Sequence, residues 1–91
     1  MKLSDDILER YVGTYLRSDH NNNLYVTKEG NSLKLSEETL STYLYSIGEN
    51  RFFAFIKGSG VELEFMKDEF NKTIKMNVYG NGKLLGEAKR V

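Results

Sequence analysis

The sequence predicts an all-β protein: an antiparallel up-and-down meander of about eight strands that forms a small barrel, with a short N-terminal helix. Two observations predict this fold. Clusters rich in Gly, Asn and Ser interrupt the chain about every 8–12 residues, which is the spacing of hairpin turns. Between the clusters, apolar and polar residues alternate with a period of two, as in strands with one buried face. A chain of 91 residues forms one core, so residues 1–91 are predicted to be a single domain.

The segment Ser4–Arg10 is predicted to form the short helix. Ser4 or Asp6 can cap its free N–H groups, and acidic residues in a first turn favour the helix dipole. Ile7 and Leu8 give it too little apolar surface to be stable alone. We therefore expect this helix to lie against the sheet and to plug one end of it.

The strands follow in order, each bounded by turn residues. Alternation is clearest in the sixth and seventh segments, where Glu62 and Glu64 would share an outer face with Lys75 and place the two strands side by side. Gly80–Gly82 predicts the tightest hairpin turn. The predicted strands are Tyr11–Arg17, Leu24–Lys28, Leu33–Leu35, Thr39–Ile47, Arg51–Ile56, Val61–Lys67, Thr73–Tyr79 and Lys83–Val91.

The inward positions should form the core. An eight-stranded barrel is just wide enough for side chains to fill it or to hold one small ligand. With strands this short, the filled version is favoured, because a cavity would remove contacts that a small core needs. The residues expected inside are Leu24, Val26, Leu33, Leu35, Leu44, Phe53, Phe55, Val61, Leu63, Phe65, Ile74, Met76, Val78 and Leu84.

Composition excludes several classes of function. The 13 basic and 13 acidic residues balance, and the isoelectric point is about 6.6, which argues against nucleic acid as a partner. No apolar stretch is long enough to span a bilayer, so direct membrane insertion is not expected. The chain has no cysteine and therefore no disulfide, thiolate metal site or thiol nucleophile.

Residues that carry chemistry are sparse. His20 is the only histidine, and no second His or Cys accompanies it to hold a metal. No Ser-x-x-Lys nucleophile motif is present. Adjacent carboxylates in turns point apart and are expected to be solvated, which does not suit acid–base catalysis. We therefore predict no catalytic residue, no metal site and no cofactor. The carboxylate pairs are Asp5/Asp6, Glu37/Glu38 and Asp68/Glu69.

Aromatic residues on the outer face are the candidate docking residues for a protein partner. Tyrosines that alternate with inward aliphatic residues should project outward, where their area and hydroxyl tip suit interfaces. The alternative is that they merely cover an exposed sheet, where aromatics are favoured anyway. Folding does not explain an exposed Phe at the tip of the sixth-to-seventh turn, which makes it a candidate contact residue. The candidates are Tyr25, Tyr43, Tyr45, Phe70 and Tyr79.

Five segments together form a recognisable pattern over nearly the whole chain: Leu8–Tyr15, in which Gly13 suggests a bend or a close backbone approach, Leu24–Leu33, Phe52–Phe53, Leu63–Asp68 and Ala88–Val91. In this order they resemble a small lipocalin-like domain of unknown function. That domain lies C-terminal to serine beta-lactamase-like, penicillin-binding-protein-like hydrolases. Family members often have Gly in the sixth-to-seventh turn where this chain has Asn71, which also tolerates positive φ.

The resemblance implies a non-catalytic accessory module that docks against a catalytic hydrolase domain or another protein. It carries over no functional residue, and it favours an extracytoplasmic location. The alternative function is a small lipocalin-like carrier of an apolar ligand, which requires a cavity of a few hundred Å³.

Overall fold

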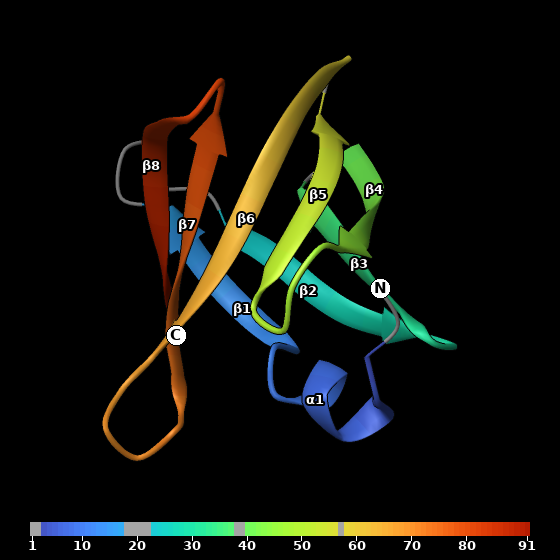
Figure 1. Ribbon diagram of the computed structural model, residues 1–91, viewed down its shortest axis with the longest axis vertical. Coiled ribbons are helices and arrows are strands. Elements are labelled where there is room, and N and C mark those ends of the chain that lie inside the picture. The colour runs from blue at the N-terminus through green and yellow to red at the C-terminus, as the bar shows by residue number, and fades with distance from the viewer. Residues whose placement is uncertain (1–2, 18–22, 38–39, 57) are drawn as a thin grey trace.

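A computed structural model describes residues 3–17, 23–37, 40–56 and 58–91. The strands form one closed barrel, in which each strand pairs antiparallel with the next and the first pairs with the last (Figure 1). The predicted up-and-down meander with a short N-terminal helix is confirmed. The elements are α1 (Asp5–Glu9), β1 (Gly13–Arg17), β2 (Asn23–Glu29), β3 (Ser32–Glu37), β4 (Leu40–Ser46), β5 (Arg51–Ile56), β6 (Ser59–Lys67), β7 (Thr73–Gly80) and β8 (Lys83–Arg90).

Helix α1 lies across one end of the barrel, as expected (Figure 1). Ser4 is its N-cap, and the side chain accepts a hydrogen bond from the backbone N–H of Ile7 at 3.4 Å. Leu8 is buried in the same hydrophobic cluster as the inward residues of the strands. Five residues are too few for a stable isolated helix, so this contact with the barrel holds α1 in place.

Positive-φ residues form the two hairpin turns that the sequence marks most clearly. Asn81 and Gly82 connect β7 to β8 with φ of 52° and 78°, which is the pattern of a type I′ turn. Asn71 lies in the β6–β7 turn with φ of 65°, so it does adopt the conformation expected of it. Asp68 organises that turn by accepting hydrogen bonds from the backbone N–H groups of Phe70 and Lys72.

Four buried aromatic rings fill the α1 end of the barrel, and we call them the aromatic floor: Tyr11, Tyr15, Phe52 and Phe65. Phe65 is their centre, because it stacks on Tyr11 at 4.4 Å between ring centroids and contacts Phe52 edge-on at 5.6 Å. The sequence prediction placed only Phe65 of these four in the core. The helix and this floor together close one end of the lumen.

Both tyrosine hydroxyls of the floor donate to backbone carbonyls. Tyr15 Oη donates to the carbonyl of Tyr11, and Tyr11 Oη donates to the carbonyl of Glu49, each at 2.8 Å. Burial raises the pKa of Tyr15 to about 12, and it raises the pKa of Tyr11 as well. The two hydroxyls are therefore held in their neutral, hydrogen-bonded form.

The prediction for β5 is wrong by one residue. Phe53 and Phe55 were expected inside, but Phe55 is 56% exposed, while Phe52 and Ala54 are completely buried. Phe52 faces Leu63 across the β5–β6 ladder, and Ala54 faces Val61, so these pairs share the inward face. Since apolar residues occupy both faces of this strand, its pattern alone could not fix the register.

Two β-bulges explain why Ile74 and Leu84 also lie outside rather than in the core. On β7, Lys75 pairs with Met66 and Thr73 pairs with Lys67, which leaves Ile74 as the extra, exposed residue. On β8, a second bulge precedes the pairing of Leu84 with Tyr79, and Leu84 is 57% exposed.

Charged side chains on the outer faces pair differently from the prediction. Strands β6 and β7 are neighbours, as expected. However, Lys75 Nζ contacts Glu87 on β8 at 3.0 Å, and it is Arg51 on β5 that approaches Glu62 and Glu64, at 3.6 and 3.9 Å. The long Arg51 side chain reaches both carboxylates from the other side of β6, because β5 pairs with that edge.

Arg90 ties the end of β8 to the segment between α1 and β1. Its guanidinium donates to the carbonyl of Val12 at 2.7 Å and to the carbonyls of Arg10 and Thr73 at 3.3 and 3.4 Å. A Cβ atom on Gly13 would lie 2.9 Å from Arg90 Nε, so of the two alternatives for Gly13, a bend or a close approach, the structure shows a close approach. It is made by a side chain that closes the barrel.

Candidate functional site

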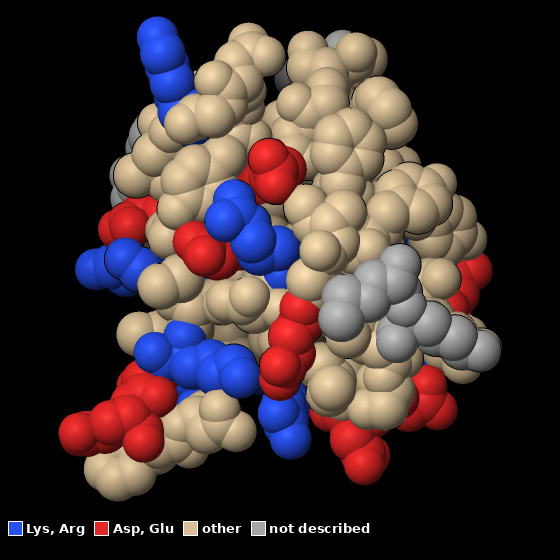
Figure 2. Space-filling model, in the orientation of Figure 1, with Lys and Arg blue, Asp and Glu red and all other residues tan. Residues whose placement is uncertain are grey.

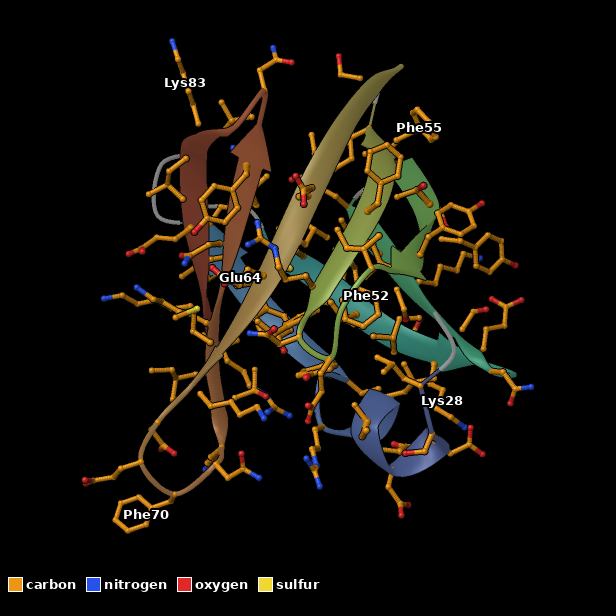
Figure 3. The ribbon with its side chains drawn as sticks, in the orientation of Figure 1. Lys28, Phe52, Phe55, Glu64, Phe70 and Lys83 are labelled. Atoms are coloured by element: carbon orange, nitrogen blue, oxygen red, sulfur yellow. The ribbon has the colours of Figure 1, made fainter. Side chains whose placement is uncertain are left out.

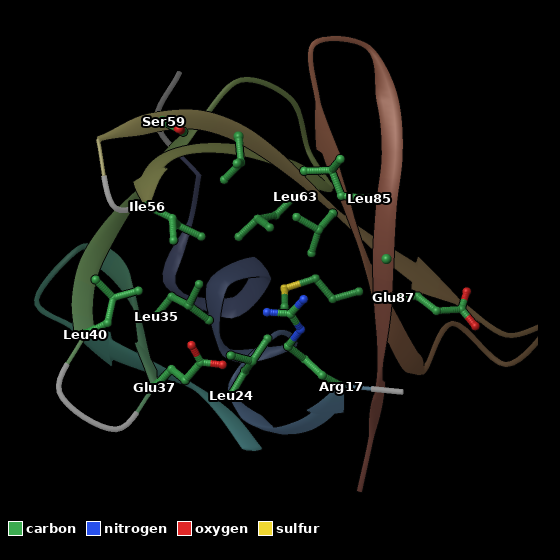
Figure 4. Close-up of a pocket in the computed structure, with 14 residues that line it drawn as sticks. Arg17, Leu24, Leu35, Glu37, Leu40, Ile56, Ser59, Leu63, Leu85 and Glu87 are labelled. Atoms are coloured by element: carbon green, nitrogen blue, oxygen red, sulfur yellow. The ribbon is translucent and has the colours of Figure 1, made fainter. Parts of the chain in front are cut away.

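The barrel is hollow at the end opposite α1. A cavity of about 340 Å³ occupies this open half of the lumen (Figure 4). The expectation of a completely filled barrel is therefore wrong for this half, although it is correct for the aromatic floor. The aliphatic side chains that line the cavity are Leu24, Leu35, Leu40, Ile56, Val61, Leu63, Met76, Val78 and Leu85.

The cavity exists because large side chains expected inside point outward. Figure 3 shows Phe55 on the outside of the barrel, whereas Phe52 lies within it. The inward position that follows Phe52 on β5 belongs to Ala54, which is completely buried but too small to fill the lumen. Gly86 on β8 also lines the cavity and contributes no side chain. The one-residue difference in β5 thus exchanges Phe53 and Phe55 for Phe52 and Ala54, which is a net loss of one phenyl group from the core.

Two charged side chains point into this apolar cavity. Arg17 follows the buried Tyr15 by two residues on β1, and Glu37 follows the buried Leu35 by two residues on β3. The period of two therefore directs both of them to the inside of the barrel. Figure 4 shows their side chains entering the cavity near Leu24, which belongs to the strand between them. Glu87 also borders the cavity, but its carboxylate points away and contacts Lys75.

Glu37 carries a buried acceptor that lacks a donor. Among the described residues, four buried side-chain polar atoms have no hydrogen-bond partner: Glu37 Oε2, Arg51 Nε, Thr73 Oγ1 and Asn77 Oδ1. Only Glu37 among these four residues lines the cavity. The expectation that this carboxylate is solvated is therefore wrong for Oε2. The carboxylate is buried because successive side chains of a strand alternate between its two faces, so Glu37, two positions after Leu35 on β3, points into the barrel.

Sequence reasoning missed both charged residues of the cavity. Glu37 was assigned to a turn, yet β3 continues through it. Arg17 was placed on the first strand, but no face was assigned to it. The alternation of the strands could have identified both residues, because each lies two positions after a buried residue of its own strand and therefore points to the same side.

The predicted docking residues do not form one surface. Tyr43 and Tyr45 lie on the outer side of β4, and Tyr45 pairs with Phe53 of β5, whose ring meets Phe55 edge-on at 4.9 Å. We call Tyr43, Tyr45, Phe53 and Phe55 the outer aromatic surface. Figure 2 shows few charges over β4 and β5, at the upper right of the molecule, while charged side chains gather over the middle of this face.

The other three predicted residues lie elsewhere. Tyr25 is on β2 and is 44% exposed. Tyr79 is on β7, where its hydroxyl donates to Glu64 Oε1 at 3.0 Å and its ring lies under Arg51. Phe70 is 81% exposed at the tip of the β6–β7 hairpin, which projects from the α1 end of the barrel (Figures 1 and 3).

Metal and membrane chemistry find no support within the described part of the chain. No group of three His, Cys, Asp or Glu side chains there is arranged to hold a metal ion. None of the helices described in this chain is long and apolar enough to cross a membrane. His20 lies outside the described residues.

Comparisons of the chain with protein-family models, with curated proteins and with solved structures give no match. Functional inference therefore depends on the residues of the barrel itself.

Proposed function

We propose that this barrel is a non-enzymatic binding domain that takes up a small apolar molecule in its open half. The observation that carries this proposal is the cavity of about 340 Å³ with its aliphatic lining. Ligand sites are generally concave, mostly apolar and about 300–1,000 Å³ in volume, so this cavity falls at the small end of that range. Helix α1 and the aromatic floor close the other end, which leaves one entrance.

Burial of apolar surface supplies the driving force. Empty cavities lined by aliphatic side chains remain dry and accept apolar guests such as benzene or xenon, even at volumes of roughly 150 Å³. A guest in this cavity would make dispersion contacts with the lining side chains, which lack packing partners there because Phe53 and Phe55 point outward. Each CH₂ transferred from water contributes about 0.8 kcal/mol. A carrier of this kind needs no catalytic residue.

Toluene is a suitable probe for this proposal, and leucine methyl NMR can locate it. We expect toluene to shift the cavity leucines, which are Leu24, Leu35, Leu40, Leu63 and Leu85. The leucines at the α1 end should move little. They are Leu3, Leu8, Leu33 and Leu44.

A blocking variant makes the test specific. Val78→Phe should place a phenyl group in the cavity and lower toluene affinity at least tenfold, since about 1.4 kcal/mol of lost contact is sufficient. Ile74→Phe, on the same strand but exposed at the bulge, is the matched control and should bind toluene normally. Equal toluene affinity in the two variants would rule out binding in the lumen.

Protein docking is the second candidate function, and the outer aromatic surface is the observation that favours it. Tyr45 and Phe55 are 57% and 56% exposed on neighbouring strands with few charges over them. Aromatic clusters of this kind are typical anchors of interfaces. The partner we propose is the catalytic domain of a serine beta-lactamase-like hydrolase, as the resemblance of the sequence implies.

Removing two tyrosines tests this docking. The double variant Tyr43→Ser/Tyr45→Ser should weaken binding of the proposed partner, a separately expressed serine beta-lactamase-like catalytic domain, by more than tenfold in calorimetry, because interface tyrosines often contribute above 1 kcal/mol each. Tyr25→Ser is the control, because Tyr25 is as exposed as Tyr43 but lies on β2. Undiminished affinity in the double variant would eliminate the outer aromatic surface as the docking site.

A further inference from the structure

Arg17 and Glu37 are the only charged side chains that Figure 4 shows entering the cavity, and they give it a chemical preference. They come from β1 and β3, the two neighbours of β2, so they lie on the same side of the lumen. Both are half-buried at positions where aliphatic residues would continue the core. Stability alone does not favour charges at such positions, because partial burial of a charge costs free energy.

The two groups have complementary hydrogen-bonding capacity. A carboxylate only accepts hydrogen bonds, whereas a guanidinium only donates them and has five N–H groups for several partners. A hydroxyl group both donates one hydrogen bond and accepts others. A ligand hydroxyl between them can therefore donate to Glu37 and, at the same time, accept from one of the several N–H groups of Arg17.

We propose, given that the cavity binds a small apolar molecule as argued above, that its ligand is a neutral alcohol: a compact hydrocarbon body bearing a hydroxyl that donates to Glu37 and accepts from Arg17. The buried Glu37 Oε2, which lacks a donor among the described residues, is the acceptor that this hydroxyl would serve. The terminal torsion of a Glu side chain is broad, so a small rotation can turn either oxygen toward the ligand.

Charge balance explains why a neutral ligand fits better than an ion. One cationic and one anionic side chain point inward, so the cavity offers no net charge to neutralise an ionic ligand. A ligand carboxylate would meet Glu37, and a ligand ammonium would meet Arg17, and either charge would also lose its hydration. A pure hydrocarbon would enter without repulsion but would leave Glu37 Oε2 unsatisfied.

Four probes with the same ring separate these cases: toluene, benzyl alcohol, benzylamine and benzoate. Titrations followed at the cavity leucine methyls should give benzyl alcohol the highest affinity, about tenfold above toluene, because its hydroxyl adds hydrogen bonds to charged groups that toluene cannot make. The two ionic probes should bind more weakly than benzyl alcohol.

Glu37→Met keeps the length of the side chain but removes its acceptor. In this variant the preference for benzyl alcohol over toluene should fall below about threefold, because the added affinity depends on that acceptor. Arg17→Met is a second variant that should also reduce the preference. The leucine methyls at the α1 end report whether each variant is folded, and the wild-type series stands on its own if a variant is not.

The outcomes separate this inference from the proposed function. If toluene binds as tightly as benzyl alcohol, or if an ionic probe binds most tightly, the assignment of an alcohol is overturned while the apolar carrier stands. If none of the four probes shifts the cavity leucines of the wild-type protein, both fail. Retention of the full alcohol preference in folded Glu37→Met would also overturn the assignment.

Discussion

Phe52→Ala should lower the free energy of unfolding by about 3–5 kcal/mol, whereas Phe55→Ala, three residues along the same strand, should lower it by about 1 kcal/mol or less. Phe52 is completely buried and contacts both Tyr11 and Phe65 edge-on. Removal of its ring leaves a cavity in the aromatic floor. Phe55 is 56% exposed and loses mainly its edge-on contact with Phe53. Urea denaturation of the two variants measures the difference.

This pair of variants tests the register of β5, and therefore the origin of the cavity. If Phe55→Ala were the more destabilising change, β5 would present its other face to the lumen. The phenyl groups of Phe53 and Phe55 would then fill the open half, and no ligand would fit there. A large cost for Phe52→Ala with a small one for Phe55→Ala supports the hollow barrel.

Alkaline pH should destabilise the barrel through Tyr15. Its pKa is raised from 10.0 to about 12 in the folded protein, because burial disfavours the phenolate. Between these values the unfolded chain has released the proton while the folded chain retains it, so stability falls as pH rises. The contribution is fully present below pH 10 and is lost as pH approaches 12, with a total of roughly 3 kcal/mol.

Tyr15→Phe is the control for this pH dependence. At neutral pH it should cost about 1 kcal/mol, because it removes the hydrogen bond from Tyr15 Oη to the carbonyl of Tyr11. Between pH 10 and 12 its stability should fall less steeply than that of the wild type, although Tyr11 still contributes through its own raised pKa. Urea midpoints across this pH range measure both slopes. Parallel slopes would show that Tyr15 is not held neutral by the fold.

The turn residues made the architecture predictable. Asn71, Asn81 and Gly82 all adopt the positive φ that their residue types allow, and they are located where strands end. In β6, Val61, Leu63 and Phe65 alternate with Glu62 and Glu64, so the inward side of this strand could be read directly from the alternation. Strand order then followed from short turns, because these connect neighbouring antiparallel strands.

Local ambiguity limited the prediction of the interior. In β5 the segment Arg51–Ile56 is apolar on both faces, and only pairing with β6 selects Phe52 and Ala54 as inward. The bulge at Ile74 shifts the parity of β7 by one residue, and no sequence signal marked it. Whether these side chains point inward or outward depends on pairing and packing with the neighbouring strands. The alternation within a single strand does not contain that information.

The candidate site lay outside the prediction for a related reason. Arg17 and Glu37 are polar, so they were not counted among inward positions, although each extends the inward row of its strand. By contrast, exposure was predicted correctly for Tyr25, Tyr43, Tyr45 and Phe70. The structure was needed to show that only Tyr43 and Tyr45 lie together, on β4.

Xenon offers the most direct view of whether the open half of the lumen is empty and apolar, because it enters dry apolar cavities without requiring any polar contact. In a crystal of the wild-type protein under xenon pressure, we expect an ordered xenon atom between Leu35, Leu63 and Met76. A lumen in which phenyl rings occupy that position, with no xenon bound, would contradict the account.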